Sequence, residues 1–256
     1  MTDLLPDLAL QTGALIFVVF VLAGFVKGVV GVGMPTIAVG LLTASIGLQP
    51  ALALMVVPTF ITNLWQGLAG PHLMGLLRRL WSYLLAATLF TGAGVALLVW
   101  LNHPLLPLIL AASLIGYGTA ALMKFRMETQ PHQEVALSPA LGAMNGLLMG
   151  LTGSGTVPGI FYFDSLALGR DAMVQAMGLL FLVITGALAI TLAALASESG
   201  SIDSRYLTLS ALCLIPSFIG IQIGAVLRHR LSEARFRQVL YIAIIAMGVV
   251  IAFRTL

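Results

Sequence analysis

Long apolar stretches follow one another along almost the whole chain, and they constrain its fold more than any other feature. They cover residues 13–26, 29–46, 51–70, 80–101, 104–123, 135–163, 172–196, 206–227 and 239–253. A helix needs about 20 apolar residues to cross a bilayer, so several stretches are long enough to span. Only 8% of the residues are charged, against roughly 25% in an ordinary soluble domain. We therefore predict an all-α, polytopic membrane protein.

Two glycine-rich motifs interrupt these stretches, and they match each other. The first is "GFVKGVVGVGMP" at 24–35 and the second is "GLLMGLTGSGTVP" at 146–158. Their four glycines align at a constant offset of 122 residues: Gly24, Gly28, Gly31 and Gly33 with Gly146, Gly150, Gly153 and Gly155. We predict two transmembrane repeats of about five helical segments each, 1–125 and 135–256, joined by a cytoplasmic linker at 126–134.

The distribution of basic residues indicates how the repeats are oriented. If each glycine-rich region turns the chain back, the two repeats are inverted and one membrane face receives nine of the basic residues outside the apolar segments. These are Arg78, Arg79, Lys124, Arg126, Arg170, Arg228, Arg230, Arg235 and Arg237. The other face receives Arg205 and Arg254, whereas straight crossings would give a split of six to five. The positive-inside rule favours the inverted arrangement, with the basic face cytoplasmic and both termini outside.

Interrupted helices inside a membrane predict a site for an anion. A helix over 33–46 is about 21 Å long, short of a hydrocarbon core of about 30 Å, so it is expected to begin inside the membrane. Its first backbone N–H groups lack intrahelical partners and carry a partial positive charge. Pro35 and Pro158 lie where each second half-helix would start, a position that suits proline. Broken helices from two inverted repeats that meet near the midplane are a recurring plan of secondary transporters.

The predicted substrate-binding residues lie in the two motifs and on the third apolar segment. We assign Gly24, Gly28, Gly146 and Gly150 mainly to helix packing, and the inner glycines to positive φ and close approach of a ligand. Thr59, Thr62, Asn63 and Gln66 fall on one face of an otherwise apolar helix. They would bond a neighbouring helix or line a substrate path. The predicted set is Gly31, Gly33, Met34, Thr36, Thr59, Asn63, Gln66, Gly153, Ser154, Gly155 and Thr156.

Two charged residues lie within these segments. Lys27 either extends to the cytoplasmic boundary or attracts an anion into a vestibule that faces the cytoplasm. Asp164 is expected to cap its half-helix or to pair with Arg170, and a proton relay is the alternative. The single cysteine, Cys213, excludes an intramolecular disulfide and is expected to pack inside an apolar helix.

The motifs at 24–35 and 146–158, the "LQPALAL" and "TNLWQ" runs within 48–66, and the helices containing "TGAGVAL" and "IGIQIGAVL" resemble the sulfite exporter TauE/SafE family. The resemblance covers nearly the whole chain. It implies a multi-pass protein of the bacterial inner membrane that exports a small sulfur-containing anion, such as sulfite or sulfoacetate. Both termini are then expected in the periplasm.

The resulting hypothesis is a secondary transporter that is not an enzyme and needs no cofactor, metal or nucleic acid. Protons are a candidate coupling ion, and the anion and the oligomeric state stay open. A passive anion channel is the nearest alternative. An intramembrane hydrolase built on Ser154 would need a base, yet the histidines His72, His103, His132 and His229 fall in or beside loops. A metal-cation transporter would need more carboxylate, histidine or cysteine ligands.

Overall fold

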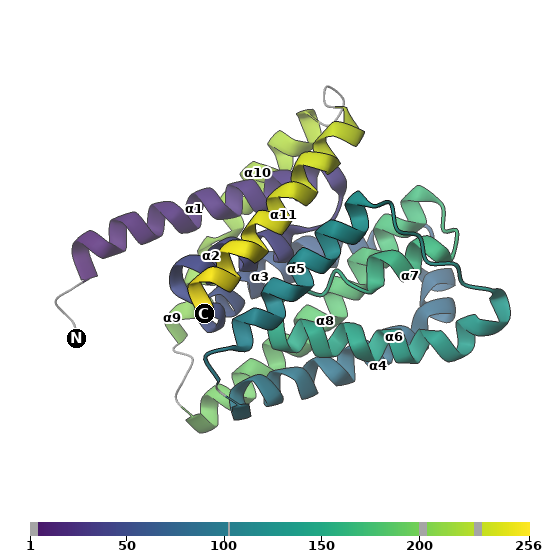
Figure 1. Cartoon of the computed structure of the whole chain (residues 1–256), viewed down its shortest axis with the longest axis horizontal. Helices are drawn as coiled ribbons and strands as arrows, with labels where there is room; N and C mark the ends of the chain where they lie inside the picture. The colour runs from purple at the N-terminus through teal and green to yellow at the C-terminus, as the bar shows by residue number, and fades with distance from the viewer. Residues whose placement is uncertain (1–4, 102, 200–203, 228–231) are drawn as a thin grey trace.

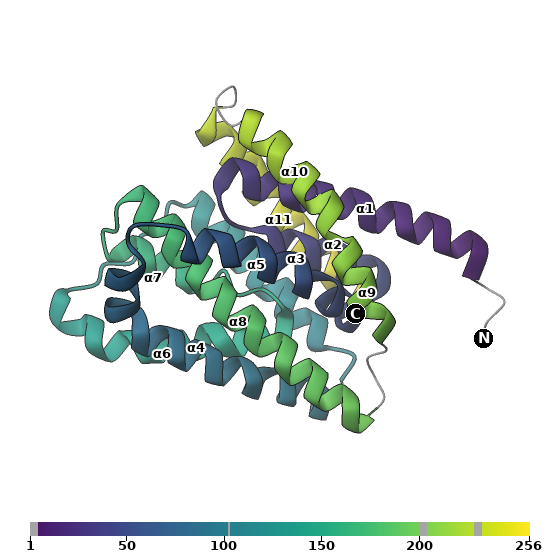
Figure 2. The same ribbon diagram turned by 180° about the vertical axis from the view of Figure 1, so that it is seen from behind.

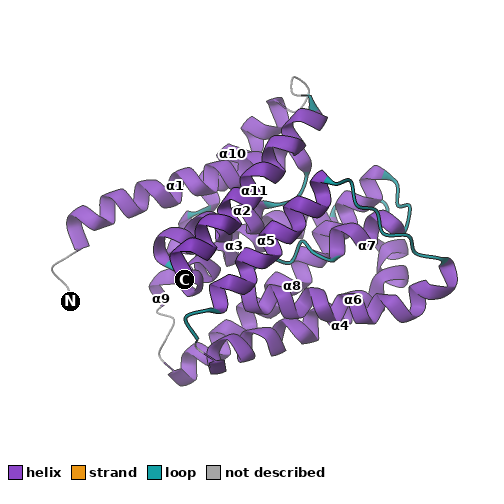
Figure 3. Cartoon of the chain, in the orientation of Figure 1, coloured by secondary structure: helices purple, strands orange, loops and turns teal. Residues whose placement is uncertain are grey.

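The computed structural model describes residues 5–101, 103–199, 204–227 and 232–256, and these residues form helices and short connections only (Figure 3). The described residues contain seven helical spans that are long and apolar enough to cross a membrane, one of which, Thr208–Leu227, contains a break, and two shorter apolar helices lie among them. The predicted all-α, multi-pass architecture is therefore confirmed.

The first half of the chain folds into five helices. They are α1 (Leu5–Val30), α2 (Met34–Ile46), α3 (Leu48–Leu68), α4 (Leu73–Leu101) and α5 (Leu106–Leu122). The break between α1 and α2 falls in the first glycine-rich motif. Helix α2 has 13 residues and is about 20 Å long, so the predicted short helix over 33–46 is confirmed.

The second half folds into six helices. They are α6 (Pro131–Thr152), α7 (Gly159–Ser165), α8 (Arg170–Ser199), α9 (Ser204–Leu212), α10 (Leu214–Leu227) and α11 (Glu233–Thr255). Helix α6 begins inside the predicted linker 126–134. The apolar stretch 206–227 is divided at Cys213, which is buried at the break rather than inside one helix. Pro216 explains the division, because it has no amide hydrogen to donate to the carbonyl of Leu212.

Glycines let helices from the two halves approach closely. A β-carbon on Gly24 would lie 2.2 Å from the carbonyl oxygen of Ser217 on α10, and one on Gly146 would lie 2.1 Å from that of Ala87 on α4. Both distances exclude any larger residue without backbone movement. The predicted packing role of these glycines is confirmed, and Figures 1 and 2 show α1 beside α10 and α4 beside α6.

Two further helix pairs, α3 with α8 and α5 with α11, also join the halves. The Gln66 amide on α3 donates to the carbonyl oxygen of Val174 on α8. Gly118 on α5 lies against Tyr241 on α11, and Gly248 on α11 lies against Ala111 on α5, so these helices are antiparallel. Each of these four pairs therefore contains one helix from each half. The buried interior of the bundle lies between the two halves.

The outer surface of the helices is apolar. Trp100, Ile190 and Phe253 expose 72 to 80% of their surface, while Asn63, Asn145 and Gln175 are buried. This reverses the distribution of a water-soluble protein and matches a protein whose surroundings are lipid chains.

Candidate functional site

The first glycine-rich motif forms a three-residue break between α1 and α2. Gly31 and Gly33 have φ angles of 91° and 98°, the left-handed region that favours glycine, as the sequence predicts. Gly33 is the N-cap residue of α2 and provides no side-chain cap. Pro35 occupies the first turn of α2, as predicted. An N–H group at this position would have no partner within the helix, so proline costs no helical hydrogen bond.

The second motif forms a longer break between α6 and α7, and it differs from the first. Gly153 has a φ of 70° and ends α6, which confirms its predicted conformation. Gly155 does not have positive φ; a β-carbon there would lie 2.4 Å from Cδ1 of the buried Ile184, so that side chain would have to shift. Pro158 is the N-cap residue of α7, which has only seven residues. The two breaks are therefore not equivalent.

The two breaks meet through hydroxyl groups. The Oγ1 atoms of Thr36 and Thr156 lie 2.6 Å apart, and the Thr36 Oγ1 and Ser154 Oγ atoms lie 3.3 Å apart. All three side chains are buried. Residues more than 110 positions apart in the chain are thus joined at the start of α2. The sequence predicted both motifs at one site, and these hydrogen bonds bring them together.

Asn145 on α6 organises the second break, and the sequence analysis missed it. Its Oδ1 accepts hydrogen bonds from the Gly159 backbone N–H at 2.9 Å and from the Tyr83 hydroxyl at 3.1 Å. Its Nδ2 donates to the carbonyl oxygen of Gly155 at 3.1 Å. A buried asparagine one residue before the motif was the available signal, because a buried amide must be hydrogen-bonded.

The first backbone donor of α7 is consequently already bonded within the protein. The Gly159 N–H points to Asn145, and the Ser154 N–H donates to the Thr152 hydroxyl at 3.1 Å. The prediction that a half-helix starting near Pro158 offers unpaired N–H groups to an anion is therefore wrong for the first N–H group of α7. The physical reason is that a seven-residue helix buried among other helices satisfies its donors with a neighbouring side chain. The start of α2 has no such side-chain cap.

Lys27 is buried beside two uncharged side chains of α3. Its Nζ donates to Asn63 Oδ1 at 2.6 Å and to Thr62 Oγ1 at 3.1 Å, and the residue is 7% exposed. The alternative in which Lys27 extends to the membrane boundary is therefore wrong. It is the only buried one among the lysines and arginines whose side-chain burial the structure describes. An ammonium group has three hydrogens to donate, and two are directed at these oxygens.

The remaining polar residues of α3 bond inside the helix bundle. Thr59 is fully buried and its hydroxyl lies 3.5 Å from the sulfur of Met55. Gln66 bonds the backbone of α8. Thr62 also lies 3.7 Å from the sulfur of Met34, the first residue of α2, so this polar group adjoins the first break. The sequence allowed hydrogen bonds from this face to neighbouring helices, and they are present for Thr62, Asn63 and Gln66.

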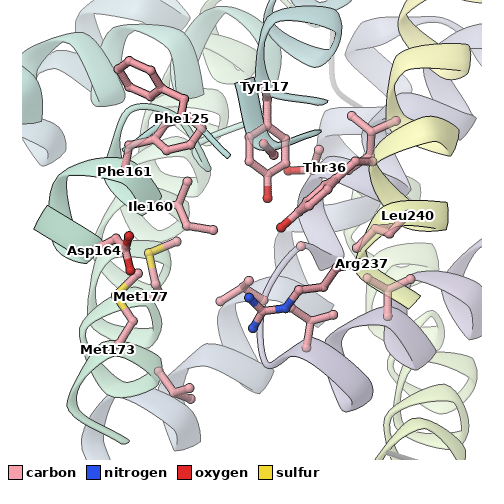
Figure 4. A pocket seen from close by; sticks show the side chains of 18 of the residues that line it. Thr36, Tyr117, Phe125, Ile160, Phe161, Asp164, Met173, Met177, Arg237 and Leu240 are labelled. Atoms are coloured by element: carbon pink, nitrogen blue, oxygen red, sulfur yellow. The ribbon is translucent and has the colours of Figure 1, made fainter. Parts of the chain in front are cut away.

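A cavity of about 500 Å³ reaches the start of α2, and Figure 4 shows it from close by. Gly33 and Thr36 line it, together with apolar and aromatic residues of α1, α5, α7, α8 and α11. Its charged lining residues are Lys124, Arg126, Asp164 and Arg237. Three cations and one carboxylate give the cavity a positive balance. In Figure 4 the Arg237 side chain reaches from α11 into the cavity, on the side opposite Asp164.

The structure distributes the predicted site residues over three places. Only Gly33 and Thr36 line the cavity. Ser154 and Thr156 contact Thr36 from behind the cavity wall, and Asn63 lies with Lys27 inside the bundle. The cationic side chains of the cavity were assigned by the sequence to topology and not to the site. The cavity therefore contains two residues of the predicted set and three cationic residues outside that set, and Lys27 does not line it.

The fold and the cavity define a multi-pass helical membrane protein with a basic cavity. The chain belongs to the sulfite exporter TauE/SafE family, whose model matches residues 16–251, and the family is one of membrane transporters. The resemblance predicted from the motifs is thereby confirmed. No curated protein and no solved structure matches the chain.

Proposed function

We propose that the chain is a secondary transporter that exports a small anion, and that the cavity is the entrance of its path. The observation that carries this proposal is the cavity lining, with three cations against one carboxylate and Thr36 of the interrupted helix at its wall. A cavity lined by one sign of charge raises the local concentration of ions of the opposite sign. Family membership favours a sulfur-containing oxyanion such as sulfite, or an organosulfonate such as sulfoacetate.

The two halves act as inverted repeats in this proposal. Support comes from the matched glycine contacts, since Gly24 and Gly28 lie against α10 as Gly146 and Gly150 lie against α4. Such repeats allow alternating access by movement of one half against the other. The basic end of the bundle would face the cytoplasm of a bacterial cell, and both termini would lie in the periplasm.

The hydrogen bonds from Thr36 to Ser154 and Thr156 serve as the seal in this mechanism. Thr36 lines the cavity, whereas its two partners do not, so these buried hydroxyls separate the cavity from what lies behind it. Opening of the seal would let the anion pass between the two breaks. Each negative charge that leaves a cell gains about 2.3 kcal/mol per 100 mV of membrane potential, so export can proceed without ATP.

In this mechanism Lys27 provides a buried positive charge outside the cavity lining. Its two hydrogen-bond partners are uncharged, so the ammonium group has no counter-ion among the residues described. A charge buried in a membrane protein is costly unless it is balanced. A transiting anion would balance it and could accept the third ammonium hydrogen.

The decisive measurement is saturable counter-transport in proteoliposomes. Vesicles loaded with unlabelled sulfite or sulfoacetate should accumulate the labelled anion, and Arg237→Gln should reduce the initial rate about tenfold. Arg254→Gln is the matched control, because Arg254 lies at the other end of the same helix and outside the cavity. Equal rates for the two variants would contradict the proposed entrance.

Two alternatives predict different results. A passive anion channel would give ohmic single-channel currents and no counter-transport. An intramembrane hydrolase would lose activity on Ser154→Ala, but the hydrogen bonds described for the Ser154 hydroxyl lead to Thr36 and not to a base. A thermal-shift panel of sulfite, sulfoacetate, sulfate, thiosulfate, lactate and oxalate would rank the anions, because a ligand of the folded state raises its stability.

A further inference from the structure

A second hollow lies on the outer face of the bundle, between α4 and α6. It encloses about 690 Å³ and shares no lining residue with the cavity described above. Arg78 and Arg79 lie at one end, in the second turn of α4. Trp81, Leu85 and Leu89 continue it along α4, and residues of α6 form the opposite wall. We refer to it as the α4–α6 groove.

The body of the α4–α6 groove is apolar and exposed. Trp81, Leu85 and Leu89 are 62, 52 and 62% exposed, and they recur every four residues on one face of α4. Val135 on the opposite wall is 81% exposed. From Arg78 to Leu89 the groove extends about 16 Å along the helix, which is about one leaflet of a hydrocarbon core about 30 Å thick.

The charged end of the α4–α6 groove can accept a phosphate group. Arg79 holds Glu134 through Nε at 2.7 Å and Nη2 at 2.9 Å, which fixes the guanidinium and leaves its Nη1 hydrogens. Arg78 is exposed and has no ion pair or hydrogen bond with the residues that the structure describes. Two arginines and one glutamate leave a net positive charge, and guanidinium groups match the geometry of phosphate oxygens.

We propose that the α4–α6 groove binds an anionic diacyl phospholipid of the leaflet at the basic end of the bundle. The phosphate contacts Arg78 and the Nη1 group of Arg79, and one acyl chain lies over Trp81, Leu85 and Leu89. Basic pockets between membrane helices are a recurring means of headgroup recognition. The site is independent of the transport function proposed above.

A second copy of the chain fits this face less well. Two copies in one membrane that are related by a twofold axis along the membrane normal would bring equal depths together. Arg78 of one copy would then face Arg78 of the other, and two like charges would meet at the interface. A lipid supplies the opposite charge at the same depth.

The experiment is native mass spectrometry and thermal unfolding of the purified chain in detergent, titrated with phosphatidylglycerol or cardiolipin and with phosphatidylcholine as the neutral lipid. We expect the anionic lipids to bind and to raise the unfolding midpoint, and Arg78→Gln to weaken binding about fivefold. Arg235→Gln is the matched control, because Arg235 is an exposed arginine that lines neither hollow. Ala86→Trp should also weaken binding, because it fills the apolar part without changing the charge.

Four results would overturn the lipid site. They are equal stabilisation by phosphatidylcholine, unchanged binding by Arg78→Gln, an equal effect of glycerol 3-phosphate without acyl chains, and a dimer that Ala86→Trp abolishes. The third would identify a site for free phosphate, and the fourth would identify a second copy as the occupant. Circular dichroism of each variant checks that it has folded.

Discussion

The side-chain oxygen of Asn63 lies 2.6 Å from the ammonium nitrogen of Lys27, deep inside the helix bundle. The two residues are on different helices, and each is buried. An uncharged acceptor holds the lysine in position without neutralising it. In the proposed transport mechanism, this leaves the charge of Lys27 available to an anion.

Asn63→Asp tests this pairing. The substitution places a carboxylate beside Lys27, so a buried ion pair replaces the charge available to the anion. We expect the fold to be retained and anion export in proteoliposomes to fall at least tenfold. Thr59→Ser, a neighbouring change on the same helix that leaves the lysine alone, should export at close to the native rate. Native export by Asn63→Asp would show that Lys27 does not meet the anion.

The contact between Thr36 and Thr156 can be locked covalently. In a Cys213→Ser background, Thr36→Cys with Thr156→Cys places two thiols where the hydroxyl oxygens lie 2.6 Å apart. Oxidation should form a disulfide and stop export, and a reductant should restore it. Each single cysteine variant is the control. Full export by the oxidised pair, with the cross-link verified by mass spectrometry, would exclude this contact as a moving seal.

Gly24→Ala should destabilise the fold, because its β-carbon would lie 2.2 Å from the carbonyl oxygen of Ser217. We expect a loss of about 1 to 3 kcal/mol in the free energy of unfolding, the usual range for overpacking. Gly13→Ala, on the same helix with nothing within 4 Å, should be neutral or stabilise by up to about 1 kcal/mol. Denaturant unfolding in detergent measures both, and equal stability of the two variants would refute the packing role.

Asn145→Leu should cost more stability than Tyr83→Phe. The first change removes three hydrogen bonds and leaves the Gly159 N–H and the Gly155 carbonyl without this partner, whereas the second removes one bond. At about 1 kcal/mol for each bond, with an added cost for buried groups left unpaired, the difference should be about 2 kcal/mol or more. Thermal unfolding of both variants tests this order. The reverse order would mean that Asn145 does not hold α7.

The sequence by itself determined the class of the protein and the places where its helices break. Few charges and long apolar stretches are properties of a chain whose solvent is lipid, and they can be read without knowing the fold. Gly31, Gly33 and Pro35 likewise act locally, because backbone conformation depends on the residue and its neighbours. The match between the two glycine motifs also predicted that distant segments meet.

Tertiary structure decided how the site is built from those parts. Asn145 accepts the hydrogen bond from the first N–H of α7, where an anion was predicted, and Arg237 enters the cavity from the last helix, far along the chain from Thr36. Lys27 proved to be held by Asn63 rather than extended to the membrane surface. The packing of helices that are far apart in sequence decides which side chain bonds a buried donor and which side chain lines a cavity. The spacing of residues along one helix does not predict this packing.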